Sequence, residues 1–251
     1  MANDPMKQFQ IKELIPLDVG GFDASFTNAS IYLLAGALIP ATLLLMASAK
    51  AAVVPGRGQM MGEGLYGFLR KSLEDAAGTD GVKMFLPLIT TLFCFILTLN
   101  LVGLWGYSFN PNSQIVITAS MALIVFFTVI VVGLIKNGLG FFKLFFPSGI
   151  PWPLYLIVTP IEIISFFARP LSHSVRLWAN IFAGGVLIKV FAGFVPAMME
   201  AGAVGVVGSI LPFIMTVALF ALKFLVAFLQ AYVFTLLTCL YLNDALHAGH
   251  H

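Results

Sequence analysis

Arg176 is the residue of this chain that most needs a chemical explanation, because it stands in a stretch apolar enough to lie inside a lipid bilayer. An arginine in the middle of a membrane helix costs at least about 2.5–3.5 kcal/mol, and its guanidinium stays protonated at any accessible pH. Such a residue indicates a site where charge is moved or stabilised, with a carboxylate as the expected partner. No acidic residue stands three or four positions from Arg176, so we expect its partner to lie elsewhere.

Polar residues around Arg176 recur at helical spacing and share one face. On an ideal helix they fall within an arc of about 100°, a pattern that chance rarely produces. A narrower stripe of polar residues recurs at every seventh position in the next apolar segment. The first set is Glu162, Ser165, Arg169, Ser172, Arg176 and Asn180, with His173 at its edge, and the second is Thr216, Lys223 and Gln230. Two consecutive membrane helices with polar faces indicate a path for ions or protons.

Other kinds of chemistry find little support in the sequence. There is no nucleotide-binding loop and no nucleophile arrangement, so we do not expect an enzyme. Cys94 and Cys239 lie in apolar runs without metal-ligand spacing, and we expect neither a metal ion nor another cofactor. The net charge of +2 is too small and too dispersed to indicate binding to nucleic acid.

The composition places these residues in an all-α integral membrane protein. Of the 251 residues, 60% are hydrophobic and 10% are charged, and the mean hydropathy is +1.00. Since about 20 apolar residues cross a bilayer as a helix, the apolar runs predict about five membrane helices. We predict one membrane domain with an external N-terminal segment over 1–29, a first span over 30–50, an amphipathic surface helix over 60–78, two spans over 84–135 with a turn at 106–113, a long helical hairpin over 154–243, and a tail over 244–251.

The distribution of basic residues predicts the orientation of these helices. Cytoplasmic loops of membrane proteins carry the excess of Lys and Arg. Such residues follow the first and third spans but are missing from the expected turn at 106–113: they are Lys50, Arg57, Arg70, Lys71 and Lys83, and then Lys136 and Lys143. We therefore expect the N-terminus outside and the C-terminal tail in the cytoplasm.

Two segments of the chain carry the pattern of a known family. They are Arg169-Pro170-Leu171-Ser172-His173-Ser174-Val175-Arg176-Leu177-Trp178-Ala179-Asn180, followed by Ala183-Gly184, and Phe228-Leu229-Gln230-Ala231-Tyr232-Val233-Phe234. With them the chain resembles subunit a of the F-type ATP synthases, the stationary proton-channel subunit beside a rotating ring of c subunits. The order of spans and the segment Thr98-Leu99-Asn100-Leu101 also fit, so the resemblance covers essentially the whole chain. The residues of these segments are similar to those of the alphaproteobacterial and mitochondrial branch of the family. A bacterial inner membrane is therefore the expected location.

The resemblance implies a function and a set of site residues. The function is proton translocation through two offset half-channels, which couples the proton-motive force to ATP synthesis by other subunits. Arg176 would face the carboxylate of the c ring, with Gln230 packed nearby; Asn180, Glu162, Ser165 and Ser172 would line the aqueous paths. The implied partners are the c-subunit ring, against which the hairpin would lie strongly tilted, b-type peripheral stalk subunits, the catalytic head and membrane lipids.

The sequence departs from this family at one informative place. The family commonly has acidic residues or histidine at the positions that match Gly185 and Lys223, where they are thought to relay protons in the outer half-channel. A hairpin that turns near residue 203 or 204 brings Gly185 to the depth of Lys223, and Arg176 to the depth of Gln230. We hypothesise that the missing side chain of Gly185 leaves room for Lys223, which takes the place of the usual relay.

Several alternatives remain open on the sequence alone. Glu162 either lines a channel or forms a structural ion pair with Arg169. We include His173 among the candidate proton-translocation residues, although a histidine in such a setting is more often a packed polar residue than a proton relay. A secondary ion transporter could also carry this polar stripe, although such transporters usually show internal repeats and several intramembrane carboxylates, which this chain lacks.

Overall fold

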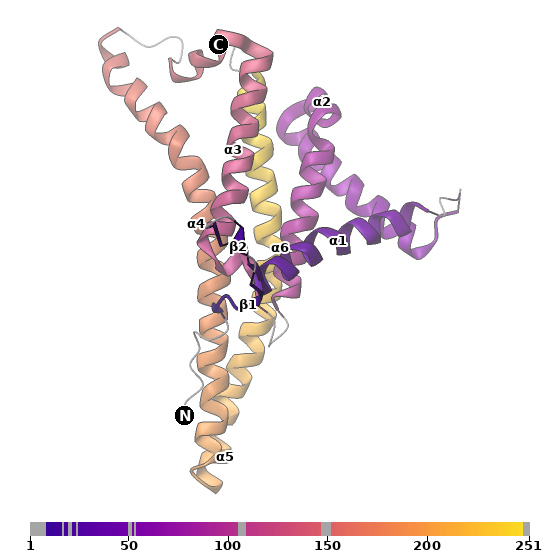
Figure 1. Cartoon of the computed structure of the whole chain (residues 1–251), viewed down its shortest axis with the longest axis vertical. Helices are drawn as coiled ribbons and strands as arrows, with labels where there is room; N and C mark the ends of the chain where they lie inside the picture. Colours follow the sequence, from indigo (N-terminus) through magenta and orange to yellow (C-terminus); the bar gives the residue numbers. More distant parts are fainter. Residues whose placement is uncertain are drawn as a thin grey trace. The chain divides into compact units, whose positions relative to one another are not determined.

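The structure of the chain, a computed structural model, is built mainly from α-helices (Figure 1). It describes residues 9–16, 18–19, 22–23, 25–49, 52, 54–104, 109–146 and 152–247. Within these residues, five helices are long and apolar enough to cross a membrane: Asn28–Ser48, Gly81–Val102, Ile115–Asn137, Leu154–Met199 and Ala203–Leu246. The predicted all-α membrane fold with about five membrane helices is therefore confirmed.

The helices and strands of the described residues follow one another along the chain in a simple order. Their bounds are β1 Glu13–Ile15, β2 Asp18–Val19, β3 Phe22–Asp23, β4 Phe26–Thr27, α1 Asn28–Ser48, α2 Arg57–Val102, η2 Pro111–Ser113, α3 Ile115–Asn137, η3 Gly138–Phe145, α4 Trp152–Met199, α5 Ala203–Gly208 and α6 Ile210–His247. The sequence did not lead us to expect strands. They form two antiparallel pairs, β1 with β4 and β2 with β3.

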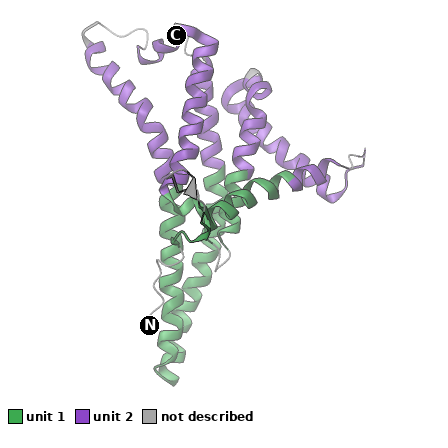
Figure 2. Cartoon of the chain, in the orientation of Figure 1, with its two compact units in different colours: residues 1–41, 95–114, 177–231 green, residues 42–94, 115–176, 232–251 purple. Residues whose placement is uncertain are grey.

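The helices contribute to two compact units (Figure 2). Unit 1 comprises residues 1–41, 95–114 and 177–231, and unit 2 comprises residues 42–94, 115–176 and 232–251. Each unit contains one part of the hairpin made by α4 and α6. In unit 1 these two helices run side by side down to α5. The chain turns between Met199 and Ala203, where Gly202 has a φ of 80°, a conformation that glycine adopts without strain. This position is close to the predicted turn at 203 or 204.

A buried amide network holds unit 1 together near the end of α2. Asn100 Nδ2 donates a hydrogen bond of 3.1 Å to the carbonyl oxygen of Ala227 in α6. Asn112 Nδ2 donates a hydrogen bond of 2.7 Å to Oδ1 of Asn100. Both asparagines are buried, at 1% and 0% exposure. Because a polar group in an apolar environment is costly unless it is hydrogen-bonded, these amides fix the position of η2 and α2 against α6.

The segment before α1 is attached to unit 1 by polar contacts at the start of that helix. Asn28 Oδ1 accepts a hydrogen bond of 3.1 Å from the backbone nitrogen of Lys12, and Asn28 Nδ2 donates one of 3.2 Å to the carbonyl oxygen of Gln10. Gln114 Nε2 donates a hydrogen bond of 2.7 Å to the carbonyl oxygen of Phe9. The predicted external segment is thus partly ordered by the first turn of α1 and by Gln114.

Helix α2 consists of two legs separated by a kink at Gly78, and its residues up to 94 belong to unit 2. This glycine has φ 68° and ψ −179°, a combination that residues with a side chain rarely adopt. The first leg, from residue 57 to residue 77, covers most of the predicted surface helix at 60–78. Leu69 and Leu73 of its apolar stripe are buried, at 1% and 0% exposure. The second leg is the membrane span Gly81–Val102.

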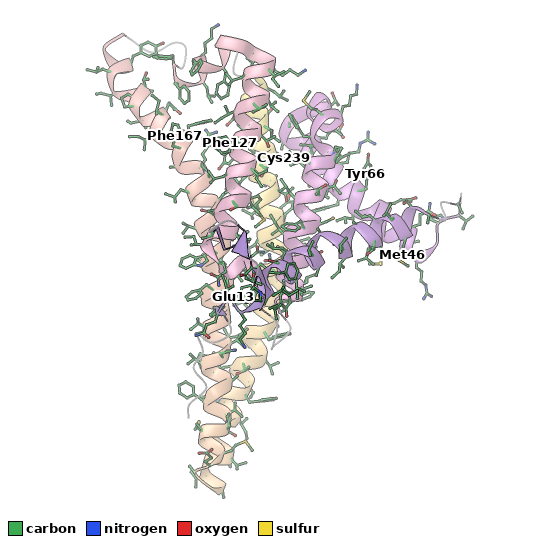
Figure 3. The ribbon with its side chains drawn as sticks, in the orientation of Figure 1. Glu13, Met46, Tyr66, Phe127, Phe167 and Cys239 are labelled. Carbon is green, nitrogen blue, oxygen red and sulfur yellow. The ribbon has the colours of Figure 1, made fainter. Side chains whose placement is uncertain are left out.

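Aromatic side chains pack α3, η3 and α4 together in unit 2. The Phe126 ring lies 5.1 Å from Phe166 and 5.7 Å from Phe167, and Phe145 lies 5.4 Å from Phe166. Figure 3 labels Phe167 on α4 and Phe127 on α3. Gly133 makes room for this cluster, because a Cβ at that position would overlap the ring of Phe141.

Two predicted boundaries differ from the structure or fall partly outside it. Of the predicted turn at 106–113, residues 105–108 lie outside the described residues, and η2 occupies its end. The predicted tail at 244–251 begins within α6, which continues to His247. Packing explains the longer helix, since Asn137 Nδ2 donates a hydrogen bond of 2.6 Å to the carbonyl oxygen of Ala245. Residues 248–251 lie outside the described residues.

We expect Asn100→Leu to destabilise the protein by about 1–3 kcal/mol, because the substitution removes two hydrogen bonds and leaves the Asn112 amide buried without its acceptor. The midpoint of thermal unfolding of the assembled complex in detergent measures this effect. Ser120→Ala is the matched control, since among the described residues the Ser120 hydroxyl bonds only to the carbonyl oxygen of Val116 in its own helix. Equal midpoints for the two variants would contradict the structural role of the network.

Candidate functional site

The polar arc predicted on α4 divides into an exposed part and a packed part. Ser165, Ser172, Arg176 and Asn180 are exposed in the chain, and Glu162 is half-buried. Arg169 and His173, which belong to the same arc, instead contact residues of α6. The exposed part forms a polar face on the membrane span Leu154–Met199. Such a face in an apolar span calls for water or a polar partner against it.

The packed part of the arc contains an ion pair within unit 2. Arg169 Nη1 donates a hydrogen bond of 3.0 Å to Asp244 Oδ2, and the side chains are 28% and 43% exposed. The Arg169 guanidinium also lies 4.9 Å from the centre of the Tyr241 ring, a cation–π contact. Sequence reasoning missed this pair, because it offered Glu162 as the partner of Arg169. The pair could have been found from the hairpin geometry. Residues 169 and 244 are separated from the turn by similar numbers of residues, so they lie at similar depths.

Arg176 stands in contrast to Arg169, which lies two helical turns earlier on the same helix. In the part of the chain that the structure describes, Arg176 forms no hydrogen bond and no salt bridge, and its side chain is exposed. Both arginines lie in the span Leu154–Met199, but only Arg169 is neutralised there. That the partner of Arg176 lies on another subunit stays a prediction.

His173 is a packed residue in this structure. Its side chain is buried at 3% exposure, with the Phe234 ring 4.7 Å away and the Tyr241 ring 5.2 Å away. The Nε2 atom has no hydrogen-bond partner among the described residues. A cavity of about 10 Å³ lies beside it, lined also by Arg169 and Tyr241, a size that holds about one water molecule. The sequence-based preference for packing fits these contacts.

The second polar stripe, on α6, lies in unit 1 and is more buried than the first. Gln230 is 9% exposed, and Lys223 and Thr216 are half-buried. Thr216 satisfies its own hydroxyl by a hydrogen bond of 2.8 Å to the carbonyl oxygen of Pro212. Gln230 lies one turn from Ala227, whose carbonyl oxygen accepts the amide of Asn100. The buried amide network thus fixes the turn of α6 that carries Gln230.

Lys223 lines a groove of about 310 Å³ between α4 and α6 in unit 1. The side chains around it are apolar except for Asn180 and Lys223 itself; the full lining is Asn180, Ala183, Gly184, Leu187, Leu219, Leu222, Lys223 and Val226. A groove with one cation and one amide can hold water molecules that pass a proton between them. The structure thus brings Asn180 and Lys223 to one site.

The glycine that the structure places beside Lys223 is Gly184, and the hypothesis that Gly185 leaves room for Lys223 stays a prediction. A Cβ built on Gly184 would lie 3.9 Å from both Cγ and Cδ of Lys223, whereas Gly185 is buried and is not part of the groove lining. Counting from the turn gives depth but does not resolve neighbouring positions on a helix, which point 100° apart. A distance of 3.9 Å is an ordinary van der Waals contact, so a methyl group at 184 would also fit beside the lysine stem.

The remaining predicted contact, between Arg176 and Gln230, involves one residue from each unit and stays a prediction. This contact was predicted from the register of α4 against α6, and two contacts within the units have the same register. Gly184 lies beside Lys223 in unit 1, and His173 lies beside Phe234 in unit 2. Both pairs are equally distant from a turn near residue 203 or 204.

Comparison with known proteins identifies the family to which this architecture belongs. The family model described as ATP synthase A chain matches residues 29–243. The chain is 53% identical to ATP synthase subunit a of Rhizobium rhizogenes over 251 residues, with 100% of both chains covered. It is 52% identical over 247 residues to ATP synthase subunit a of Mesorhizobium japonicum, with 98% of each chain covered. It is also 51% identical to ATP synthase subunit a 1 of Brucella anthropi over 250 residues.

These similarities extend across all five candidate membrane helices and decide against the alternative of a secondary ion transporter. The chain therefore belongs to the ATP synthase A chain family, and it is a membrane-embedded, non-catalytic subunit that translocates protons in the membrane sector of an ATP synthase.

Proposed function

We propose that Arg176 is the cation that each ring carboxylate meets as a c ring rotates past this chain. One observation carries the proposal: Arg176 is exposed on an apolar membrane span and has no salt bridge among the described residues. Arg169 has the same charge and lies on the same helix, but Asp244 already neutralises it. An unpaired guanidinium in a membrane requires an anion, and a carboxylate on a neighbouring subunit supplies one.

The electrostatics of this pair favour proton release at Arg176. A ring carboxylate that turns through lipid must be protonated, because a bare charge there costs several kcal/mol. Beside Arg176 the preference reverses, since opposite charges about 4 Å apart attract by about 4 kcal/mol at an effective dielectric constant of about 20. The carboxylate therefore gives up its proton as it approaches and takes another after it has passed. Arg176 also keeps protons from crossing directly between the two half-channels.

The half-channels are proposed on either side of this arginine. Glu162, Ser165 and Ser172 lie on the polar face of α4 in unit 2 and would line one aqueous path. The groove with Asn180 and Lys223 in unit 1 supports the second path. Gln230 would pack near Arg176 and keep its guanidinium oriented. His173 is proposed as a packing residue that helps to hold α4 against α6.

The energy source and the orientation complete the proposal. A membrane potential contributes about 2.3 kcal/mol per charge per 100 mV, so the direction of rotation follows the proton gradient. We propose an inner-membrane location in a bacterium, with the N-terminus outside and the C-terminus in the cytoplasm. The other partners would be b-type stalk subunits and the catalytic head, where ATP is made.

Arg176→Ala is expected to abolish ATP-driven proton pumping, because the ring carboxylate would no longer be held ionised. Pumping by inverted membrane vesicles is followed with a fluorescent pH probe. The matched control is the double variant Arg169→Gln with Asp244→Asn, which removes a guanidinium from the same helix together with its partner. We expect the control to retain most of its pumping, and retained pumping in Arg176→Ala would sink the assignment.

Lys223→Met is expected to slow pumping at least tenfold if the lysine passes protons in the groove, since methionine keeps the volume but cannot accept a proton. The same vesicle assay measures it. Lys189→Met is the control, because Lys189 lies in the same unit but outside the groove. Unchanged pumping in Lys223→Met would remove the lysine from the proton path.

The orientation predicts that a peptide tag added after His251 is cut by protease in inverted vesicles and protected in intact spheroplasts. A tag added before Met1 should behave in the opposite way. The basic residues of the first leg of α2 and of the end of α3 are the physical basis for this expectation. Protection of the C-terminal tag in inverted vesicles would reverse the topology.

A further inference from the structure

Unit 2 contains a groove that the proton path does not use. It has a volume of about 580 Å³, within the range of about 300–1,000 Å³ that is usual for ligand sites. Three segments form it: the end of α1, the first leg of α2 and the second leg of α2. The kink at Gly78 turns the second leg back, so that residues before and after it line the same groove. Figure 3 labels Tyr66, one of the lining residues of the first leg.

The groove combines two cations with an apolar wall. Arg70 of the first leg and Lys83 of the second leg both line it and both are exposed. Neither forms a salt bridge with any side chain that the structure describes. The other lining residues are mainly apolar: Leu44, Val82, Leu86 and Pro87, with Tyr66, Thr90 and Thr91. The groove therefore combines the positive charges of Arg70 and Lys83 with apolar side chains that can contact a hydrocarbon chain.

Thr90 adds a polar group without a partner to this wall. Its Oγ1 atom is buried and has no hydrogen-bond partner among the described residues. The neighbouring Thr91 differs, because its hydroxyl donates a hydrogen bond of 2.8 Å to the carbonyl oxygen of Pro87. A buried hydroxyl without a partner costs free energy, so a ligand with an acceptor at this level would gain from it.

We propose that this groove binds one anionic phospholipid. Its phosphate would lie between Arg70 and Lys83, an ester carbonyl would accept from Thr90, and an acyl chain would follow Leu44, Leu86 and Pro87. Basic pockets beside membrane helices are known to attract anionic headgroups. A free phosphate ion would gain nothing from the apolar wall, and a zwitterionic lipid would bring an ammonium group toward the two cations. Val82, Leu86 and Pro87 of the wall belong to the candidate membrane span Gly81–Val102.

The test uses the intact ATP synthase that contains this chain, reconstituted in phosphatidylcholine vesicles. A trace of phosphatidylglycerol with a photoreactive acyl chain is added, or phosphatidylcholine with the same chain. Mass spectrometry then measures labelling of the peptide that covers residues 82–91. We expect phosphatidylglycerol to label it about thirtyfold more than phosphatidylcholine, which corresponds to about 1 kcal/mol for each cation.

Matched variants separate the site from general surface charge. Arg70→Gln with Lys83→Gln should abolish the preference for phosphatidylglycerol. Arg57→Gln with Lys71→Gln removes the same charge from exposed residues of the same leg that lie outside the groove. This variant should keep the preference for phosphatidylglycerol. The exchange Arg70→Lys with Lys83→Arg should also keep it. Equal labelling by the two lipids, or an unchanged preference in Arg70→Gln with Lys83→Gln, would overturn the proposal.

A last arm distinguishes a lipid from a free anion. Millimolar inorganic phosphate is added at constant ionic strength to the wild-type complex. Labelling by phosphatidylglycerol should stay unchanged, because phosphate lacks the acyl chain that fills the groove. Loss of labelling would show that the site takes a free anion, and would overturn the assignment to a phospholipid.

Discussion

The cost of a charge in an apolar membrane span is the constraint on which the rest of this structure depends. Two arginines lie on one face of α4, and the chain treats them differently. Arg169 has a carboxylate 3.0 Å away and an aromatic ring beside it, so its charge is compensated within unit 2. Arg176 is left exposed. If carboxylates of the same chain neutralised both arginines, α4 would have no unpaired cation for the proposed carboxylate of a neighbouring subunit.

Packing contacts hold α4 close to Arg176 and α6 close to Gln230. His173 is clamped between Phe234 and Tyr241, one turn before Arg176 on the same helix. In unit 1, the amide of Asn100 holds α6 one turn before Gln230. Such contacts matter because a guanidinium on a loosely held helix could move to the headgroups, as long basic side chains do near membrane ends. The proposed attraction between Arg176 and a ring carboxylate therefore depends on α4 and α6 being held in place.

The sequence predicted most of the fold for reasons that can be named, whereas the roles of the candidate site residues stay predictions. Hydropathy reveals membrane helices because each span must satisfy its backbone internally and its surface must be apolar. An arginine in such a span stands out for the same reason. The strands near the N-terminus were missed, since β2, β3 and β4 have two residues each and leave no alternating pattern. The ion pair of Arg169 was missed because its partner is 75 positions away. The contact of Gly184 with Lys223 was not predicted, because counting from a turn gives depth but not direction.

The contact between Gly184 and Lys223 has a consequence for how this site can change. A methyl group at 184 would make only an ordinary contact with the lysine stem, so alanine would fit there without moving Lys223. Gly184 and Lys223 also line the same groove of about 310 Å³, although they come from different helices. A longer side chain at 184 would therefore extend into that groove beside Lys223, and a polar group could reach it from α4 as well as from α6.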